Sequence, residues 1–257
     1  MQTPLIQLIN LRKAFGKNVV LDGLNLDIRE HESVVVLGPS GTGKSVLLKH
    51  IVGILRPDAG QVLYHNTRID NLPERKLEPI RKRFGFLFQG AALFDSMNVL
   101  ENIAFPLREH TDHTDSQIRE IVAQKLAMVG LSDTQAKMPA DLSGGMKKRV
   151  ALARAIALDP EVVLYDEPTT GLDPIRSDVI NELILKLKEE LHVTSIIVTH
   201  DMTSAFKVAD RMVMLSRGKV IAEGPPNDIR NNPNEEVQNF VLGKASPEDL
   251  EALHRNK

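Results

Sequence analysis

Cysteine is absent from the 257 residues, which excludes a disulfide framework and any thiolate-bound metal and fits a reducing compartment. No apolar run approaches the ~20 residues that a membrane-spanning helix needs. The first residues, MQTPLIQLINLRKAFG, lack the charged start and apolar core of a secretory signal. If the protein works at a membrane, we therefore expect another polypeptide to supply the spanning part.

An excess of basic residues is missing as well. The chain has 32 Lys and Arg against 34 Asp and Glu, a net charge of −2, whereas proteins that coat nucleic acid need basic groups to neutralise phosphates. We therefore expect no nucleic-acid partner. Apolar residues make up 42% and charged residues 26%, an ordinary balance for a globular protein whose length allows a sizeable buried core.

Short apolar segments alternate with segments of helical period. Continuous apolar runs predict buried strands at 33–37, 84–88, 161–165 and 193–199. Between the last two, apolar residues recur at steps of three and four along DVINELILKLKEEL, which predicts an amphipathic helix. Strands joined by helices require parallel crossover units, so the predicted fold class is α/β with a mainly parallel sheet.

Three further regions depart from this alternation. IQLINLRKAF and VVLDGLNLDIRE near the start, and RMVMLSRGKVIAEG near the end, predict antiparallel strands. Residues 109–141 are polar and helical with an apolar stripe, and we expect a helical subdomain over about 90–158. One domain is expected over 1–245, followed by a polar tail, 246–257, with a short helix that begins at Ser246.

The segment GPSGTGKS matches G-x-x-x-x-G-K-[ST] between an apolar strand and a helical run. Its glycines would let backbone N–H groups surround a phosphate at the positive end of the helix. Lys44 would reach the β- and γ-phosphates of ATP, and the Ser45 hydroxyl would ligate Mg²⁺. A glycine-rich turn with a chance lysine is disfavoured by the context. The predicted loop comprises Gly38, Pro39, Ser40, Gly41, Thr42, Gly43, Lys44 and Ser45.

Two acidic residues end the apolar run VVLYDE. The carboxyl ends of strands in an open α/β sheet meet at the ligand crevice. Asp166 is therefore the candidate that holds Mg²⁺, and Glu167 the candidate that orients or deprotonates the attacking water. A solvent-exposed strand end would be the default interpretation of this pair without the phosphate loop.

LSGGM precedes the helical run KKRVALARAIAL, shortly before the acidic strand end. Ser143 alone would be a helix cap beside Gly144 and Gly145. In this order, however, the motifs make the chain resemble the nucleotide-binding subunits of ATP-binding-cassette (ABC) transporters along nearly its whole length. Many members of that family have glutamine where this chain has Met146, which puts only the fine contacts of the helix in doubt.

The resemblance implies further roles. Phe15 would stack on adenine, although a core phenylalanine is the alternative from sequence alone. Gln89 would sense the γ-phosphate and metal and face the membrane partner. Asp173 would lie at the boundary between subunits, and His200 would contact the γ-phosphate, with a structural histidine as the alternative. The resemblance also implies a homodimer in which the LSGG of one subunit closes over the ATP of the other.

The cargo depends on a narrower resemblance. GAALFDSMNVLENIAFPL, residues 90–107, is apolar where the family faces its permease, although packing of the helical subdomain would use such residues too. The sequence of this stretch resembles that of one branch of the family, the ATPases of Mla phospholipid transport, which work with Mce-type lipid-binding proteins. That implies a peripheral subunit on the cytoplasmic face of the bacterial inner membrane, bound to integral permease subunits. Residues 240–257 are either a dimer clasp or a disordered end.

Three alternatives stay open at this point. The chain could serve an importer of amino acids or another small solute, against which only the 90–107 stretch argues. A soluble ABC-type ATPase of translation or DNA repair would usually have two cassettes or a long coiled coil. A small-molecule kinase also uses a phosphate loop, but LSGG followed by the acidic strand end counts against it.

Overall fold

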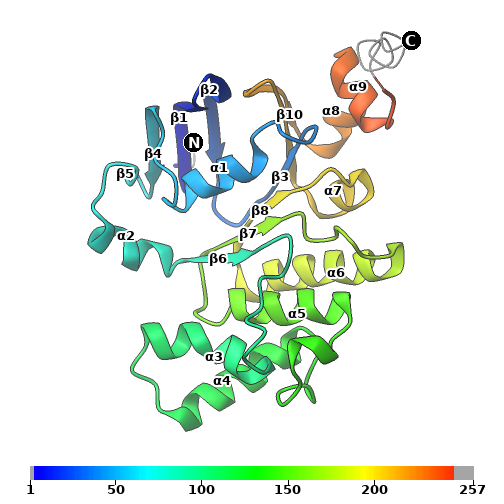
Figure 1. Ribbon diagram of the computed structural model, residues 1–257. Helices are drawn as coiled ribbons and strands as arrows, with labels where there is room; N and C mark the ends of the chain where they lie inside the picture. The colour runs from blue at the N-terminus through cyan, green and yellow to red at the C-terminus, as the bar shows by residue number, and fades with distance from the viewer. Residues whose placement is uncertain (1–2, 246–257) are drawn as a thin grey trace.

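The computed structural model describes residues 3–245 (Figure 1). Its centre is a six-stranded sheet with the order β10-β9-β3-β8-β7-β6. Four neighbouring pairs, from β9 to β6, run parallel, and β10 is antiparallel to β9. The strands are β3 (Ser33–Leu37), β6 (Phe84–Leu87), β7 (Val162–Asp166), β8 (Thr194–Val198), β9 (Arg211–Ser216) and β10 (Lys219–Gly224). The predicted strands, the hairpin near the end and the α/β class are confirmed.

A second, antiparallel sheet has the order β2-β1-β4-β5. The predicted strands near the start are its first two members, paired with each other. The apolar pattern of the sequence did not predict β4 or β5. The strands are β1 (Ile6–Phe15), β2 (Asn18–Ile28), β4 (Ala59–Tyr64) and β5 (Thr67–Arg68).

Strand β3 divides the core between the two faces of the central sheet. Val34 and Val36 pack with the antiparallel sheet and helix α1 (Lys44–Ile51), whereas Val35 and Leu37 pack with the helices of the other face. Successive side chains of a strand point to opposite faces, so a strand covered on both sides is mostly apolar. All five residues of β3 are buried, and the four from Val34 to Leu37 are apolar.

Three helices follow one another between β6 and β7 and lie at the bottom of Figure 1. They are α3 (Val99–His110), α4 (Asp115–Met128) and α5 (Gly144–Ala155), with a 3₁₀ turn at Pro139–Asp141. These helices lie within the span of about 90–158 that was expected to be helical. Within 109–141 the helix is interrupted, because residues 111–114 and 129–138 form irregular segments. Asn98 forms a capping box with Glu101 and begins α3, and Thr114 caps α4 separately.

Helix α6 (Pro174–Leu191) confirms the amphipathic helix predicted before β8: Ile180, Ile184 and Leu187 are buried. The remaining helices are α2 (Glu74–Arg81), α7 (Met202–Val208), α8 (Pro226–Arg230) and α9 (Glu235–Val241). The helix predicted in the tail, 246–257, lies outside the described residues. Within residues 3–245 no helix combines the length and apolarity that crossing a membrane requires.

Candidate nucleotide-binding site

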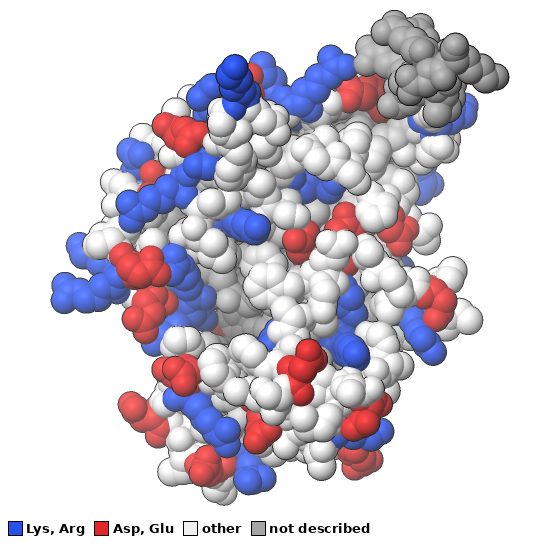
Figure 2. All heavy atoms as spheres, in the orientation of Figure 1, with Lys and Arg blue, Asp and Glu red and all other residues white. Residues whose placement is uncertain are grey.

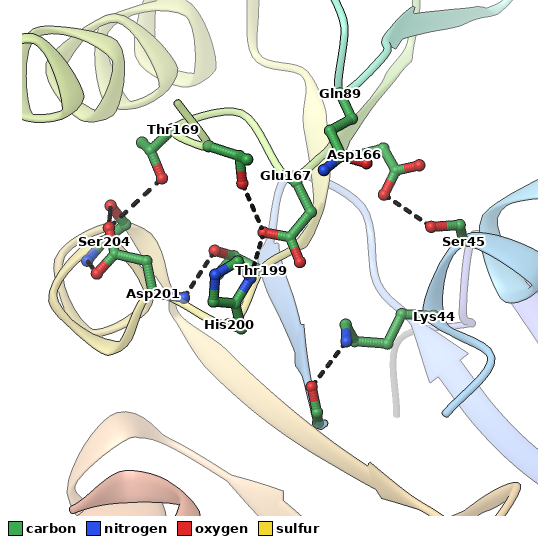
Figure 3. Close-up of polar contacts among 12 residues, drawn as sticks. Lys44, Ser45, Gln89, Asp166, Glu167, Thr169, Thr199, His200, Asp201 and Ser204 are labelled. Carbon is green, nitrogen blue, oxygen red and sulfur yellow. Dashed lines mark hydrogen bonds and ion pairs between the residues drawn. The ribbon is translucent and has the colours of Figure 1, made fainter. Parts of the chain in front are cut away.

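The candidate residues gather where β3, β7 and β8 end (Figure 3). Gly38–Ser45 connects β3 to α1, Asp166 and Glu167 lie at the end of β7, and His200 follows β8. Because these strands are parallel, their carboxyl ends meet at one edge of the sheet, the edge at which open α/β sheets bind ligands. Parallel pairing therefore brings together residues from three distant parts of the chain.

Two glycines of the phosphate loop have no possible substitute. Gly38 has φ 147°, and a Cβ atom there would lie 2.3 Å from the carbonyl oxygen of Leu215 on β9. Gly43 has φ 96°, and its Cβ would lie 2.8 Å from a methyl group of Val20. Both approaches are closer than real Cβ contacts, so the loop can pass β9 and β2 only with glycine at these positions.

Lys44 is a buried cation inside the loop. Its Nζ donates to the carbonyl oxygens of Gly38 at 2.7 Å and Pro39 at 3.0 Å. Burial lowers the pKa of the ammonium group, and the carboxylates of Glu167 and Asp166 act in the opposite direction. The ammonium group is thus held at the loop by two carbonyl oxygens. Phosphate oxygens would be stronger acceptors for its hydrogen bonds.

The Ser45 hydroxyl donates to Oδ1 of Asp166 across 2.9 Å. A hydroxyl and a carboxylate side by side form the kind of oxygen donor set that Mg²⁺ prefers. Burial raises the pKa of Asp166, with a smaller contribution from the charge of Glu167, while the bond from Ser45 lowers it. Burial and the neighbouring charge of Glu167 make the ionised form of Asp166 unfavourable. A divalent cation bound there would stabilise that form.

Glu167 is 9% exposed and has φ 50°, a left-handed conformation that is uncommon for a residue with a side chain. Its amide donates to the Val198 carbonyl at 2.9 Å, which fixes this turn against β8. One carboxylate oxygen, Oε2, lies 2.9 Å from Nδ1 of His200 and accepts from the Thr170 hydroxyl at 3.3 Å. These contacts restrain the orientation of the carboxylate. A group that positions a water molecule would need such restraint.

A hydrogen-bonded network lies behind His200 (Figure 3). Asp201 caps α7, and its Oδ2 accepts from the Ser204 hydroxyl at 2.6 Å and from Thr169 at 3.4 Å. Ser204 in turn accepts from the buried amide of Asn181 at 2.9 Å. These bonds join the segment after Glu167 to the residue after His200, so the two segments that carry Glu167 and His200 are fixed relative to each other.

Gln89 follows β6 and is exposed. Its backbone carbonyl accepts from Nζ of Lys148 at 2.5 Å, and the same ammonium donates to the Glu167 carbonyl at 3.2 Å. Lys148 is 5% exposed, and burial lowers its pKa. The sequence analysis missed this residue. Its only signal was a lysine on the same helical face as Gly145 and Leu152, which are also buried.

A cavity of about 410 Å³ opens among these elements. Lys44, Ser45, Gln89, Glu167 and His200 all line it, together with Phe15 and Val20. Phe15 is 50% exposed, so the alternative of a core phenylalanine is wrong. An apolar ring in the same cavity as the lysine and serine of the phosphate loop suits a purine nucleotide.

Ser143 and Asp173 lie apart from this cavity, since neither lines it. Ser143 caps α5, and Asp173 caps α6 and pairs with Arg176 at 3.2 Å. Gly144 approaches Leu172 and Gly145 approaches Arg176, so the two helix starts are neighbours. Within one chain, therefore, the structure does not bring Ser143, Gly144 and Gly145 to the phosphate loop.

The fold and this constellation define a nucleotide-binding cassette, and the family model described as "ABC transporter" matches residues 21–170. The chain belongs to the ABC transporter family.

Particular relatives extend over most of the chain. The intermembrane phospholipid transport system ATP-binding protein MlaF of Haemophilus influenzae is 44% identical over 95% of this chain and 93% of its own. MlaF of Escherichia coli K12 is 38% identical over 95% and 92%. A probable ribonucleotide transport ATP-binding protein, mkl, of Mycobacterium leprae is 44% identical over 93% of this chain and 69% of its own.

Solved structures agree with the fold. A dimeric post-hydrolysis state of the ATP-binding cassette MJ0796, bound to ADP and Pi, is 34% identical with a TM-score of 0.79, over 86% of this chain and 98% of that one. CbiO1 from Clostridium perfringens, part of an ABC transporter complex, is 29% identical with a TM-score of 0.83, over 99% and 100%. The chain is an ABC-family ATPase that binds ATP.

Proposed function

We propose that this ATPase powers phospholipid transport between the inner and outer membranes of a bacterium. The observation that carries the proposal is the likeness to two MlaF proteins along almost the whole of both chains. The relative mkl is named for ribonucleotide transport, so the family alone does not determine the cargo.

In this proposal Mg²⁺ accompanies ATP at the cavity. Ser45 and Asp166 already lie 2.9 Å apart with their oxygens together, and Gln89 lines the same space. The ion would neutralise developing phosphate charge. Lys44 would hold the β- and γ-phosphates, Glu167 would orient the attacking water, and His200 would contact the γ-phosphate while keeping Glu167 in place.

The working unit in this proposal is a pair of identical chains. Ser143 and Gly144 are exposed at the start of α5, and neither they nor Gly145 lines the nucleotide cavity of the same chain; MJ0796 is dimeric. A two-fold dimer would let each LSGG complete the partner's site. Hydrolysis would remove contacts made only with the γ-phosphate, and the dimer would open. Asp173 would lie at the boundary between subunits.

The permease would bind in an apolar groove. This groove, about 900 Å³, lies between α2 and α3 and includes Phe86, Phe88, Phe94 and Phe105, with Arg154 of α5 also in its lining. Figure 2 shows a hollow there, beside charged side chains over α2. The 90–107 stretch contributes both to the core and to the groove. Val99, Ile103 and Leu107 are buried in the core. Phe94 and Phe105 remain exposed, and the centroids of their rings lie 5.0 Å apart.

A short amphipathic helix of an integral membrane subunit would fit such a groove, apolar against the rings and polar toward the α2 rim. The groove lies next to Gln89, so binding there is linked to the nucleotide cavity through one short segment. The protein would then be peripheral on the cytoplasmic face of the inner membrane, in a complex that includes an Mce-type lipid-binding protein.

The test is mild detergent extraction of the tagged chain from its native membrane, followed by identification of bound proteins and lipids. We expect permease subunits, an Mce-domain protein and phospholipid. A Phe105→Glu variant should lose all three, whereas Met138→Glu, at a residue with the same 37% exposure outside the groove, should keep them. Copurification with an amino-acid-binding protein, with a ribonucleotide transporter or with ribosomes would contradict the phospholipid assignment.

A further inference from the structure

A second cluster of metal-ligating side chains lies at the amino ends of the central strands, the edge of the sheet away from the nucleotide cavity. Glu30, His65 and Glu161 each offer one ligand atom there, and these atoms all lie within 4.8 Å of one another. Glu30 precedes β3, and Glu161 immediately precedes β7. His65 comes from the other sheet, in the turn between β4 and β5.

Glu161 is already held in position. Its amide donates to the Arg83 carbonyl at 2.9 Å, and its own carbonyl accepts from Thr194 at 3.0 Å. The Tyr64 hydroxyl donates to Oε2 of the carboxylate, while Oε1 lies 2.8 Å from Nε2 of His65. An outer hydrogen bond to a ligating carboxylate is a regular feature of protein metal sites, because it fixes the direction of the free oxygen.

His65 is fixed by its backbone and its ring. The residue has φ 46°, followed by Asn66 at φ 59°, so the two form the tight turn of the β4–β5 hairpin. Its amide donates to the Leu5 carbonyl at 2.9 Å. The imidazole packs edge-on against Tyr64, with ring centroids 4.6 Å apart. The half-exposed imidazole places a ring nitrogen within 4.8 Å of a carboxylate oxygen of each glutamate.

We propose that Glu30, His65 and Glu161 form a binding site for a divalent transition-metal ion of the zinc class. One imidazole with two carboxylates is a donor set for such ions, and three protein ligands leave a position for water. Mg²⁺ and Ca²⁺ prefer oxygen donors alone. The two carboxylates carry the negative charge that a dication needs.

The ion would join the two sheets. His65 belongs to the antiparallel sheet, and the two glutamates precede strands of the central sheet. An ion that binds only the folded chain raises the free energy of unfolding. At saturating ion, the increase grows with the logarithm of the ratio of ion concentration to dissociation constant. The site would therefore act as a clamp between the sheets, remote from the chemistry of ATP.

The test is isothermal titration of the purified full-length chain with ZnCl₂, after removal of metals with a chelator and without nucleotide. We expect one zinc site whose affinity falls at least tenfold in His65→Asn, because asparagine tolerates the left-handed turn but offers no imidazole. Glu161→Gln should weaken the site similarly. Co²⁺ should give visible absorption bands in the wild type that these variants lack.

The nucleotide cavity contains its own histidine and carboxylates, so His200→Asn is the matched control: it should leave this zinc site in place. Zinc should also raise the melting temperature of the wild type but not of His65→Asn, and melting without zinc shows that each variant folds. Equal zinc affinity in wild type and His65→Asn, loss of binding only in His200→Asn, or no zinc binding by the wild type would overturn the proposal.

Discussion

Nδ1 of His200 lies 2.9 Å from Oε2 of Glu167. The two residues follow neighbouring parallel strands, β8 and β7, and the Glu167 turn is bonded to the Val198 carbonyl of β8. The carboxylate that would activate water is therefore held from two directions before any nucleotide binds. The position of each of the two side chains therefore depends on the other.

Glu167→Gln should retain ATP but hydrolyse it at least ~10²-fold more slowly, since an amide cannot accept the proton of the attacking water. The γ-phosphate then persists, and the variant should form an ATP-dependent dimer in size-exclusion chromatography. Lys44→Ala, which removes the phosphate contact, is the control that should stay monomeric with ATP. A Glu167→Gln chain that remains monomeric at saturating ATP would refute the two-fold scheme.

Asp166→Asn should raise the thermal stability of the nucleotide-free chain. Burial raises the pKa of Asp166, so at neutral pH its ionised form costs folding free energy, and the amide removes that cost. A gain of ~1 kcal/mol would raise Tm by about 2–4 °C in a chain of this size.

The sign of the pH dependence follows from proton linkage. Between the ordinary pKa of 3.8 and the raised value, the folded chain binds more protons than the unfolded chain, so its stability falls as pH rises. The advantage of Asp166→Asn should therefore be full at neutral pH and vanish as pH falls toward the ordinary value. Tm measured against pH for both chains checks this, and a constant difference would contradict it.

Lys148→Met should slow hydrolysis about tenfold, equivalent to ~1.4 kcal/mol, with little change in ATP affinity. The ammonium holds the Gln89 and Glu167 carbonyls together but does not line the nucleotide cavity. Separate measurement of kcat and KM distinguishes this from a binding defect. Lys148→Arg should restore part of the rate, and Lys147→Met, at the neighbouring residue, is the control.

Ser204→Ala should lower stability by about 1–3 kcal/mol, because it leaves the buried Asn181 amide without its acceptor and removes one of the hydrogen bonds to Asp201. It should also reduce kcat, since Asp201 then holds the segment around His200 less firmly. Ser177 lines the same surface pocket as Asn181 and Ser204, so Ser177→Ala serves as the control in denaturant unfolding. Equal stability of the two variants would count against the network.

Much of the site could be predicted because its signals are local. The phosphate loop needs glycine at fixed spacing, a preceding strand and a following helix. All three can be recognised in one continuous segment of the sequence. The acidic end of β7 was also recognisable, because parallel strands place their carboxyl ends together. His200 was assigned only through the resemblance to the ABC family. Helix α3 lies within the helical subdomain expected over about 90–158, but its start was not predicted, although Asn98 and Glu101 form a capping box, because the run 90–107 was interpreted mainly as a surface for the permease.

The sequence by itself determined the strand and helix pattern, the α/β class and the phosphate loop, since these depend on residues near one another in the chain. Only the tertiary structure decided that Phe15 is exposed at the cavity, that Lys148 bridges two carbonyls, and that Glu167 adopts a left-handed turn. It alone placed Glu30, His65 and Glu161 together. Such contacts join segments far apart in the chain, and neither periodicity nor spacing carries that information.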